Sequence, residues 1–203
     1  VGTYEDPATA RRGEWLYSFV LRSIIFGWIG AWKIEYKRLT RNGGSAISLK
    51  NEVLVWQLVQ IGLMALVYFF LGTLVLCCFV FGSFISVFIL EAINYIEHYG
   101  LLRKKLESGR YERVQEKHSW NSNHILGRIV LYELTRHSDH HRISVTKYQN
   151  LKSIDKSPQL PFGYPIMVVF SLIPFLWRRV MNPKVIKWRE QFYPDVKEWR
   201  GLS

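Results

Sequence analysis

An uninterrupted apolar stretch, residues 53–90, limits what this chain can fold into more than any other feature. It contains no charged residue in 38 positions. As one straight helix it would be about 57 Å long, whereas the hydrocarbon core of a bilayer is about 30 Å thick. One span is therefore too long and two spans fit. We predict transmembrane helices at 53–71 and 74–90, separated by a turn at Gly72 and Thr73.

The charged residues lie on either side of this stretch. Residues 1–52 contain eight Lys and Arg, residues 98–160 contain twelve, and the predicted hairpin tip contains none. Because Lys and Arg concentrate in cytoplasmic loops, this pattern predicts that both flanks are cytosolic. The net charge of +11 fits an anionic lipid surface or an acidic partner. We expect no nucleic-acid binding, since no nucleic-acid motif accompanies the charge.

The N-terminal flank is predicted to lie at the membrane surface. Residues 14–36 are rich in Trp, Phe and Ile, but Arg22 and Lys33 leave an apolar run that is too short to cross a bilayer. We interpret this segment as an interfacial amphipathic helix, with a core-facing helix as the alternative. Residues 38–52, which contain two adjacent glycines, are predicted to form a loop.

The C-terminal flank contains a second, shorter apolar segment at 162–177. It has 16 residues with two prolines inside, which favours a re-entrant or interfacial segment followed by a basic tail. The predicted fold class is an all-α integral membrane protein, in which a transmembrane helical hairpin carries a cytosolic, helical, histidine-rich metal-binding region. The predicted regions are an interfacial helix and loop (1–52), two transmembrane helices of which the second extends into the cytosol (53–97), the histidine-rich region (98–160), and the apolar segment with its tail (161–203).

All six histidines fall within 44 positions of the cytosolic part. His137, His140 and His141 have the spacing i, i+3 and i+4, which brings them to one face of a helix predicted at 122–141. Neutral imidazoles bind iron, zinc and copper. Three imidazoles on one face therefore predict a metal site, with a solvated polar patch at a helix end as the alternative.

A fourth metal ligand is predicted from the second transmembrane helix. No helix breaker follows the apolar stretch until Gly100, so the helix should carry His98 into the cytosol. Glu91 and Asn94 lie two turns and one turn earlier and are predicted to support His98 from outside the metal's own ligand set. Glu97 is turned about 100° away from His98, and we interpret it as a surface carboxylate.

The other polar residues of this region have weaker predictions. His118 and His124 are interpreted as hydrogen-bonded loop histidines, with metal ligation as the alternative. Glu133 and Asp139 could at best orient imidazoles as hydrogen-bond acceptors. Two metals with at least three protein ligands each would need about six. Four histidines therefore predict either one metal or further ligands outside this chain.

Four motifs, in this order, closely resemble the integral-membrane alkane 1-monooxygenases. They are NYIEHYGLLR at 94–103, GRYERV at 109–114, HSWNSNH at 118–124 and RHSDHH at 136–141. The sequence PQLPFGYPIM at 158–167 also resembles the segment that follows the last histidine box of that family. Membrane fatty-acid desaturases share the spacing of the last box alone, whereas the ordered set is specific.

The resemblance implies an enzyme that hydroxylates the terminal carbon of medium-chain n-alkanes with O₂ and electrons from rubredoxin. It implies a di-iron site to which His98, His137, His140 and His141 contribute ligands. It also implies a multi-pass protein of the bacterial inner membrane with the metal site on the cytoplasmic side. The first residues resemble the stretch after the family's second histidine box, so we expect a C-terminal half whose remaining iron ligands lie upstream.

An alkane would reach such a site from the bilayer. Val80, Phe84 and Val87 lie on the helix face that leads through Glu91 towards His98, and we predict that they line the substrate route. The basic surface suits an acidic electron carrier such as rubredoxin. Two alternatives stay open: a membrane fatty-acyl desaturase or hydroxylase of the same superfamily, and a non-enzymatic zinc-binding membrane module.

Overall fold

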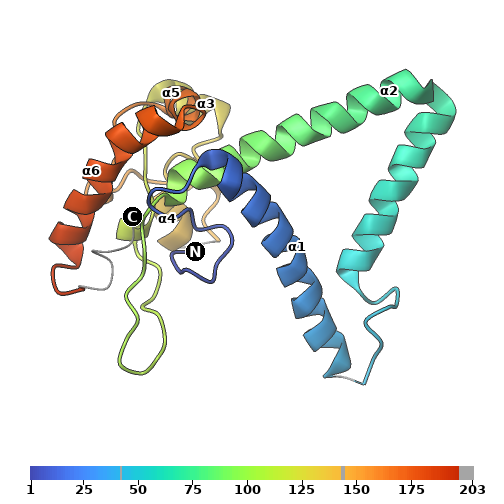
Figure 1. The fold of residues 1–203 in the computed structure, drawn as a ribbon, viewed down its shortest axis with the longest axis horizontal. Coiled ribbons are helices and arrows are strands. Elements are labelled where there is room, and N and C mark those ends of the chain that lie inside the picture. The colour runs from blue at the N-terminus through green and yellow to red at the C-terminus, as the bar shows by residue number, and fades with distance from the viewer. Residues whose placement is uncertain (42, 143–144, 197–203) are drawn as a thin grey trace. The chain divides into compact units, whose positions relative to one another are not determined.

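The computed structural model describes residues 1–41, 43–142 and 145–196, and these residues form helices and loops without a strand (Figure 1). The predicted all-α fold is confirmed. The last residues of the predicted basic tail, 197–203, lie outside the described part. The α-helices of the described residues are α1 (Leu16–Thr40), α2 (Glu52–His98), α3 (Ile125–Val130), α4 (His137–Arg142), α5 (Tyr164–Ser171) and α6 (Pro174–Phe192).

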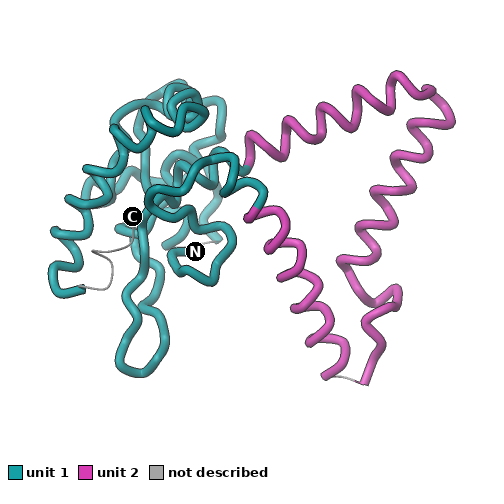
Figure 2. The backbone as a smooth tube through the Cα atoms, viewed as in Figure 1, with its two compact units in different colours: residues 1–21, 91–203 teal, residues 22–90 magenta. Residues whose placement is uncertain are grey.

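The chain divides into two compact units, coloured separately in Figure 2. The first unit combines Val1–Leu21 with Glu91–Ser203, and the second is Arg22–Leu90. The long helices α1 and α2 each contribute to both units. All of the histidines belong to the first unit, so the site is built from that unit alone.

The apolar part of α2 dominates the second unit. Gly72 interrupts the helix with φ +81° and ψ 175°, a conformation open essentially to glycine, at the residue where the sequence predicts the turn. Figure 1 shows the two helical parts of α2 meeting at a sharp bend. Within the described residues, α2 is the one single helix long and apolar enough to cross a membrane. The transmembrane hairpin and the cytosolic location of its flanks stay predictions.

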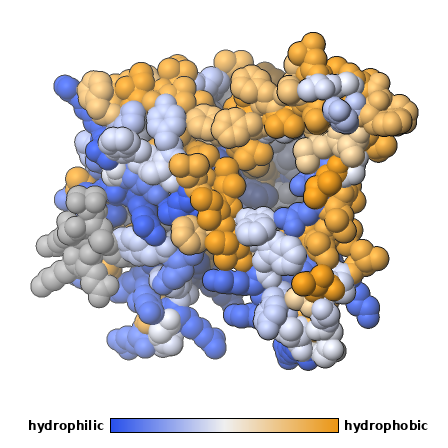
Figure 3. Space-filling view, turned by 45° about the vertical axis from the view of Figure 1, so that its right-hand side comes forward, coloured by the Kyte–Doolittle hydropathy of each residue, from blue (hydrophilic) through white to orange (hydrophobic). Residues whose placement is uncertain are grey.

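Protein contacts do not cover the apolar side chains of this arm. None of the most apolar 18-residue window of α2 is buried, and Figure 3 shows hydrophobic side chains over much of one face of the molecule. A soluble monomer rarely leaves so much contiguous apolar surface in water. Together these observations indicate a membrane protein.

Helix α1 begins two residues after its predicted start and continues four residues beyond its predicted end. Leu16 and Phe19 are buried, whereas Phe26 and Ile34 are exposed. The predicted loop before α2 is confirmed, since α1 ends at Thr40 and α2 begins at Glu52. The interfacial location of α1 stays a prediction.

An aromatic cluster forms the core of the first unit around the end of α2. The ring of Trp177 lies 5.1 Å from that of Tyr95 and 5.2 Å from that of Tyr99, measured between centroids. The Tyr99 hydroxyl donates to Asn182 Oδ1 at 2.7 Å, and the Tyr95 hydroxyl donates to the carbonyl of Glu14 at 2.7 Å. Buried aromatic rings with satisfied hydroxyls fix the last turns of α2 against α6.

The helix predicted at 122–141 is wrong, because the chain forms two short helices there. α3 ends at Val130, and both Tyr132 (φ +49°) and Glu133 (φ +62°) adopt the left-handed backbone conformation, which stops a right-handed helix. The Glu133 N–H donates to the carbonyl of Arg128, which closes the end of α3. α4 then begins at His137, so the histidine cluster has a short helix of its own.

The apolar segment predicted at 162–177 is also divided. α5 and α6 meet at a bend of 120° after a short break. Pro165 and Pro174 each lie in the first turn of a helix, where a missing N–H costs no hydrogen bond. The re-entrant or interfacial interpretation of this segment stays a prediction.

Candidate metal centre

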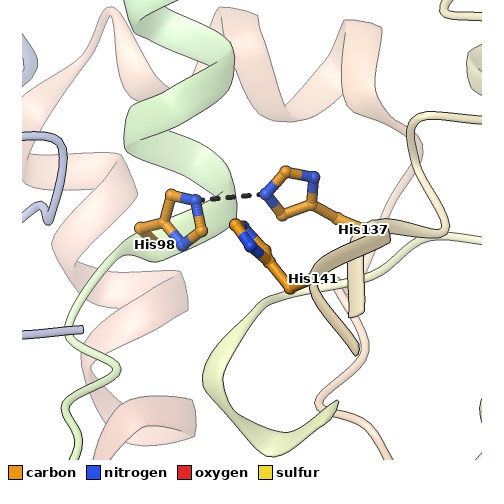
Figure 4. A group of neighbouring side chains, drawn as sticks. All are labelled: His98, His137 and His141. Carbon is orange, nitrogen blue, oxygen red and sulfur yellow. Dashed lines mark hydrogen bonds between the residues drawn. The ribbon is translucent and has the colours of Figure 1, made fainter. Parts of the chain in front are cut away.

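Three imidazoles meet where α2 ends and α4 begins. One ring nitrogen from each of His98, His137 and His141 lies within 4.8 Å of the other two. The Nε2 atoms of His98 and His137 are 3.1 Å apart, and Figure 4 shows the three rings turned towards one another. His98 and His137 are buried and His141 is half-buried. Residues 39 positions apart thus form one pocket of nitrogen ligands.

The geometry of this group fits a shared metal ion. Two nitrogens that each lie about 2.1 Å from one ion are about 3.0–3.4 Å apart, and the observed 3.1 Å is in this range. His141 Nε2, the third imidazole's nitrogen, is buried without a hydrogen-bond partner among the described residues. Such buried polar atoms are rare unless something else satisfies them.

The protonation state of the ring nitrogens also suits metal binding. Burial, reinforced by the neighbouring imidazoles, lowers the pKa of His137 well below its usual value. Burial likewise lowers the pKa of His141 to about 4. Both rings are therefore neutral at pH 7, and the neutral ring is the form that donates a lone pair to a metal.

His140 lies at the edge of this group. Its ring centroid is 5.7 Å from those of both His137 and His141, and the residue is half-buried. It is not one of the three residues whose ligand atoms converge within 4.8 Å. Its role as a metal ligand stays a prediction.

The HSWNSNH motif holds α4 in place. Asn121 Oδ1 accepts a hydrogen bond from the backbone N–H of Ser138 at 2.8 Å, and the Ser138 hydroxyl donates to the carbonyl of Glu116 at 2.7 Å. Both Asn121 and Ser138 are buried. Sequence reasoning missed this function of Asn121, although a buried amide is well suited to anchor a helix of six residues.

The prediction that Glu97 is a surface carboxylate is wrong. Its side chain is only 1% exposed. Glu97 Oε1 accepts a hydrogen bond from the Tyr164 hydroxyl at 3.0 Å, and Oε2 lies 3.2 Å from His137 Nε2. The helical offset does turn Glu97 away from His98, but α4 and α5 close over that side of α2.

The interpretation of His118 as a hydrogen-bonded histidine agrees with its contacts. The Gln115 N–H donates to His118 Nδ1 at 2.9 Å, and His118 Nε2 lies 2.7 Å from the Tyr193 hydroxyl. A neutral ring therefore carries its proton on Nε2 and donates it to Tyr193, whose hydroxyl in turn contacts Glu112. His124 is exposed, with Nδ1 near a serine hydroxyl.

The remaining predicted residues have other partners or none. Asp139 accepts hydrogen bonds from Arg142 and from the backbone N–H of Lys152, and Glu133 pairs with Arg128. Neither contacts a histidine ring within the described residues, so the structure gives no support for their role in orienting imidazoles. Glu91 has a buried oxygen without a hydrogen-bond partner among the described residues, and Asn94 is half-buried. The three residues predicted to line the substrate route are exposed on α2: Val80, Phe84 and Val87.

Comparison with known proteins adds the family. Residues 1–171 match the fatty acid desaturase family. The chain belongs to this family. Within it, the chain is 44% identical over 185 residues to Alkane 1-monooxygenase 1 of Pseudomonas aeruginosa, covering 91% of this chain and 48% of the relative.

Two further relatives have similar names. Alkane 1-monooxygenase 2 of Alcanivorax borkumensis is 43% identical over 207 residues, which is 100% of this chain and 54% of the relative. Alkane 1-monooxygenase of Ectopseudomonas oleovorans is 44% identical over 188 residues, or 93% of this chain and 47% of the relative. The resemblance predicted from the motifs is confirmed, and the chain spans about half the length of these curated relatives. The family and the histidine cluster together indicate a site for non-haem iron.

Proposed function

We propose that this chain forms part of a membrane monooxygenase that hydroxylates the terminal carbon of medium-chain n-alkanes. The observation that carries the proposal is the group of converging, neutral imidazoles of His98, His137 and His141 at the end of a long apolar helix. The similarity to proteins named alkane 1-monooxygenase supports the substrate class.

His98, His137, His140 and His141 would hold iron, which supplies the activation of O₂ that a C–H hydroxylation needs. The residues themselves bind the metal through neutral nitrogens and exclude water from it, since His98 and His137 are almost fully buried. A dry site strengthens the electrostatic interactions between ligands and metal.

A di-iron centre would need further ligands. Two irons with at least three protein ligands each require about six, and this chain offers four histidines for the site. The chain also spans about half the length of its relatives. We propose that the remaining ligands come from the part of the protein that these 203 residues do not cover.

The substrate and the membrane fit this arrangement. An alkane is apolar and partitions into the bilayer, so it would approach along the apolar arm of α2. Val80, Phe84 and Val87 share the helix face that leads to His98, which supports their role as route residues. The distribution of Lys and Arg supports a multi-pass protein of the bacterial inner membrane with the metal site on the cytoplasmic side.

Rubredoxin is the proposed electron donor, and the first unit has a hollow suited to an acidic protein. This hollow of about 270 Å³ is lined in part by Lys156, Lys184 and Lys187, which outnumber its one acidic side chain, Asp155. Its wall includes Trp120, whose backbone N–H donates to the carbonyl of Glu97 at 2.9 Å. An electron donor bound in this hollow would be connected to the end of α2 through Trp120 and this hydrogen bond.

Charge reversal tests this docking site. Lys184→Glu with Lys187→Glu should raise the KM for rubredoxin and reduce the salt dependence of turnover, because long-range attraction would be lost. The matched control is Lys147→Glu, which lies outside the hollow. Equal effects of the two changes, or a wild-type rate that does not vary with salt, would remove the hollow from the electron path.

Product analysis tests the reaction itself. The full-length protein in membranes is supplied with a reduced electron donor, O₂, and either n-octane or an acyl lipid. We expect 1-octanol from octane. A desaturated or hydroxylated acyl chain with no octanol would favour the acyl-lipid alternative, which the family name keeps open.

A further inference from the structure

The buried pair formed by Glu97 and Tyr164 has no function in the account above. Both side chains are 1% exposed, and they belong to different helices, the end of α2 and the start of α5. The Tyr164 hydroxyl donates to Glu97 Oε1 at 3.0 Å. Removing a carboxylate from water is costly unless a cation or several hydrogen bonds compensate.

No Lys or Arg side chain supplies that cation in the part of the chain that the structure describes. The other close contact of the carboxylate is with His137, whose Nε2 lies 3.2 Å from Oε2. His137 is one of the three imidazoles whose ligand atoms converge. The buried carboxyl group of Glu97 is therefore directed at the metal site.

The contacts of His137 Nε2 cannot all be ordinary hydrogen bonds. This one atom lies 3.2 Å from Glu97 Oε2 and 3.1 Å from His98 Nε2. A ring nitrogen carries either one hydrogen or one lone pair, so it can pair with only one of these neighbours at a time. A cation near the two nitrogens would remove the conflict and would also attract the carboxylate.

We propose that Glu97 and Tyr164 are positioning residues of the metal centre. The Glu97 carboxylate lies beside the ligating nitrogen of His137, where it offsets the charge of the bound metal, and the Tyr164 hydroxyl holds the carboxylate in place. Residues that lie just outside a metal's own ligand set commonly tune metal affinity. The pair also ties α5 to α2, so the start of α5 becomes part of the support of the site.

The test compares iron binding and stability in the full-length protein. Glu97→Gln keeps the shape and an acceptor for Tyr164 but removes the charge. We expect iron affinity, measured by competition with a chelator, to fall about 10- to 100-fold. Tyr164→Phe should cause a smaller loss, since the carboxylate stays. Matched controls are Glu107→Gln, an exposed carboxylate, and Tyr148→Phe, an exposed tyrosine.

The melting temperature of the metal-free protein separates positioning from simple packing. Because Gln keeps the shape of the side chain and an acceptor for Tyr164, metal-free Glu97→Gln should melt near the wild-type temperature, while its iron-loaded form melts lower than the wild type. Unchanged iron affinity, or equal destabilisation of the metal-free and iron-loaded forms, would overturn the proposal. Wild-type affinity in Tyr164→Phe would overturn the part assigned to Tyr164.

This inference rests on the proposed function only for the identity of the metal. Iron binding is measured without alkane, so the two ideas fail separately. If the protein binds iron but makes no octanol, the reaction is wrong and Glu97 can still be tested. If octanol forms and Glu97→Gln binds iron normally, the positioning role is wrong and the reaction stands.

Discussion

The packing of Gly100 against α6, just after the metal site, can be tested by substitution. Gly100 lies two residues after His98, has φ +71°, and its N–H donates to the carbonyl of Ala10 at 2.8 Å. A Cβ added there would lie 2.8 and 2.9 Å from the two methyl groups of Val185, which is buried. Gly100→Ala therefore combines backbone strain with a steric clash.

The two contributions can be separated. A left-handed alanine costs about 1–2 kcal/mol, and overpacking a closed core costs about 1–3 kcal/mol more. Gly109 has φ +77° but nothing within 4 Å of an added Cβ, so Gly109→Ala should show the backbone cost alone. The difference of about 1–3 kcal/mol corresponds to roughly 2–12 °C in Tm for a protein of this size.

The assay is thermal unfolding of the purified full-length protein in detergent. Val185→Ala removes both methyl groups, so it should recover most of the extra loss in the Gly100→Ala background, a coupling that a double-mutant cycle measures. Equal losses for Gly100→Ala and Gly109→Ala, or no coupling to Val185, would refute the close packing of α6 against the end of α2.

Three further predictions concern single sites. His118→Ala should keep its iron. Burial lowers the pKa of His118 to about 4, so the wild type should lose stability as pH falls from about 6.5 towards 4. His118→Gln should reduce this pH dependence of stability, and an identical dependence would contradict the burial of His118. Trp in place of Val80, Phe84 or Val87 should shorten the longest alkane accepted, and an unchanged product range would remove these residues from the route. His140→Ala should lower iron content and abolish hydroxylation, and normal activity would exclude it as a ligand.

The part of the fold that depends on local sequence was predictable. The absence of charge over residues 53–90 indicated a long apolar helix, and Gly72 marked its break. No breaker separates this helix from Gly100, and α2 does continue to His98. The i, i+3, i+4 spacing also brought His137 and His141 to one side of α4.

The rest depends on contacts between distant segments. Residues 128–141 contain neither glycine nor proline, so nothing local indicated the break between α3 and α4. A residue from before α3 stabilises the break: the Ser122 N–H donates to the carbonyl of Thr135, which lies between α3 and α4, at 3.0 Å. Glu97 was misjudged for the same reason: helical spacing describes its relation to His98, whereas its partners come from α4 and α5.

The central claim is that histidines from α2 and α4 bind iron together, and metal analysis of His98→Ala tests it most directly. Metal content is measured in the purified full-length protein, beside the wild type and His118→Ala. We predict iron in the wild type and in His118→Ala, and a large loss of iron in His98→Ala. Zinc at full occupancy without iron in the wild type, or iron retained in His98→Ala, would contradict the account.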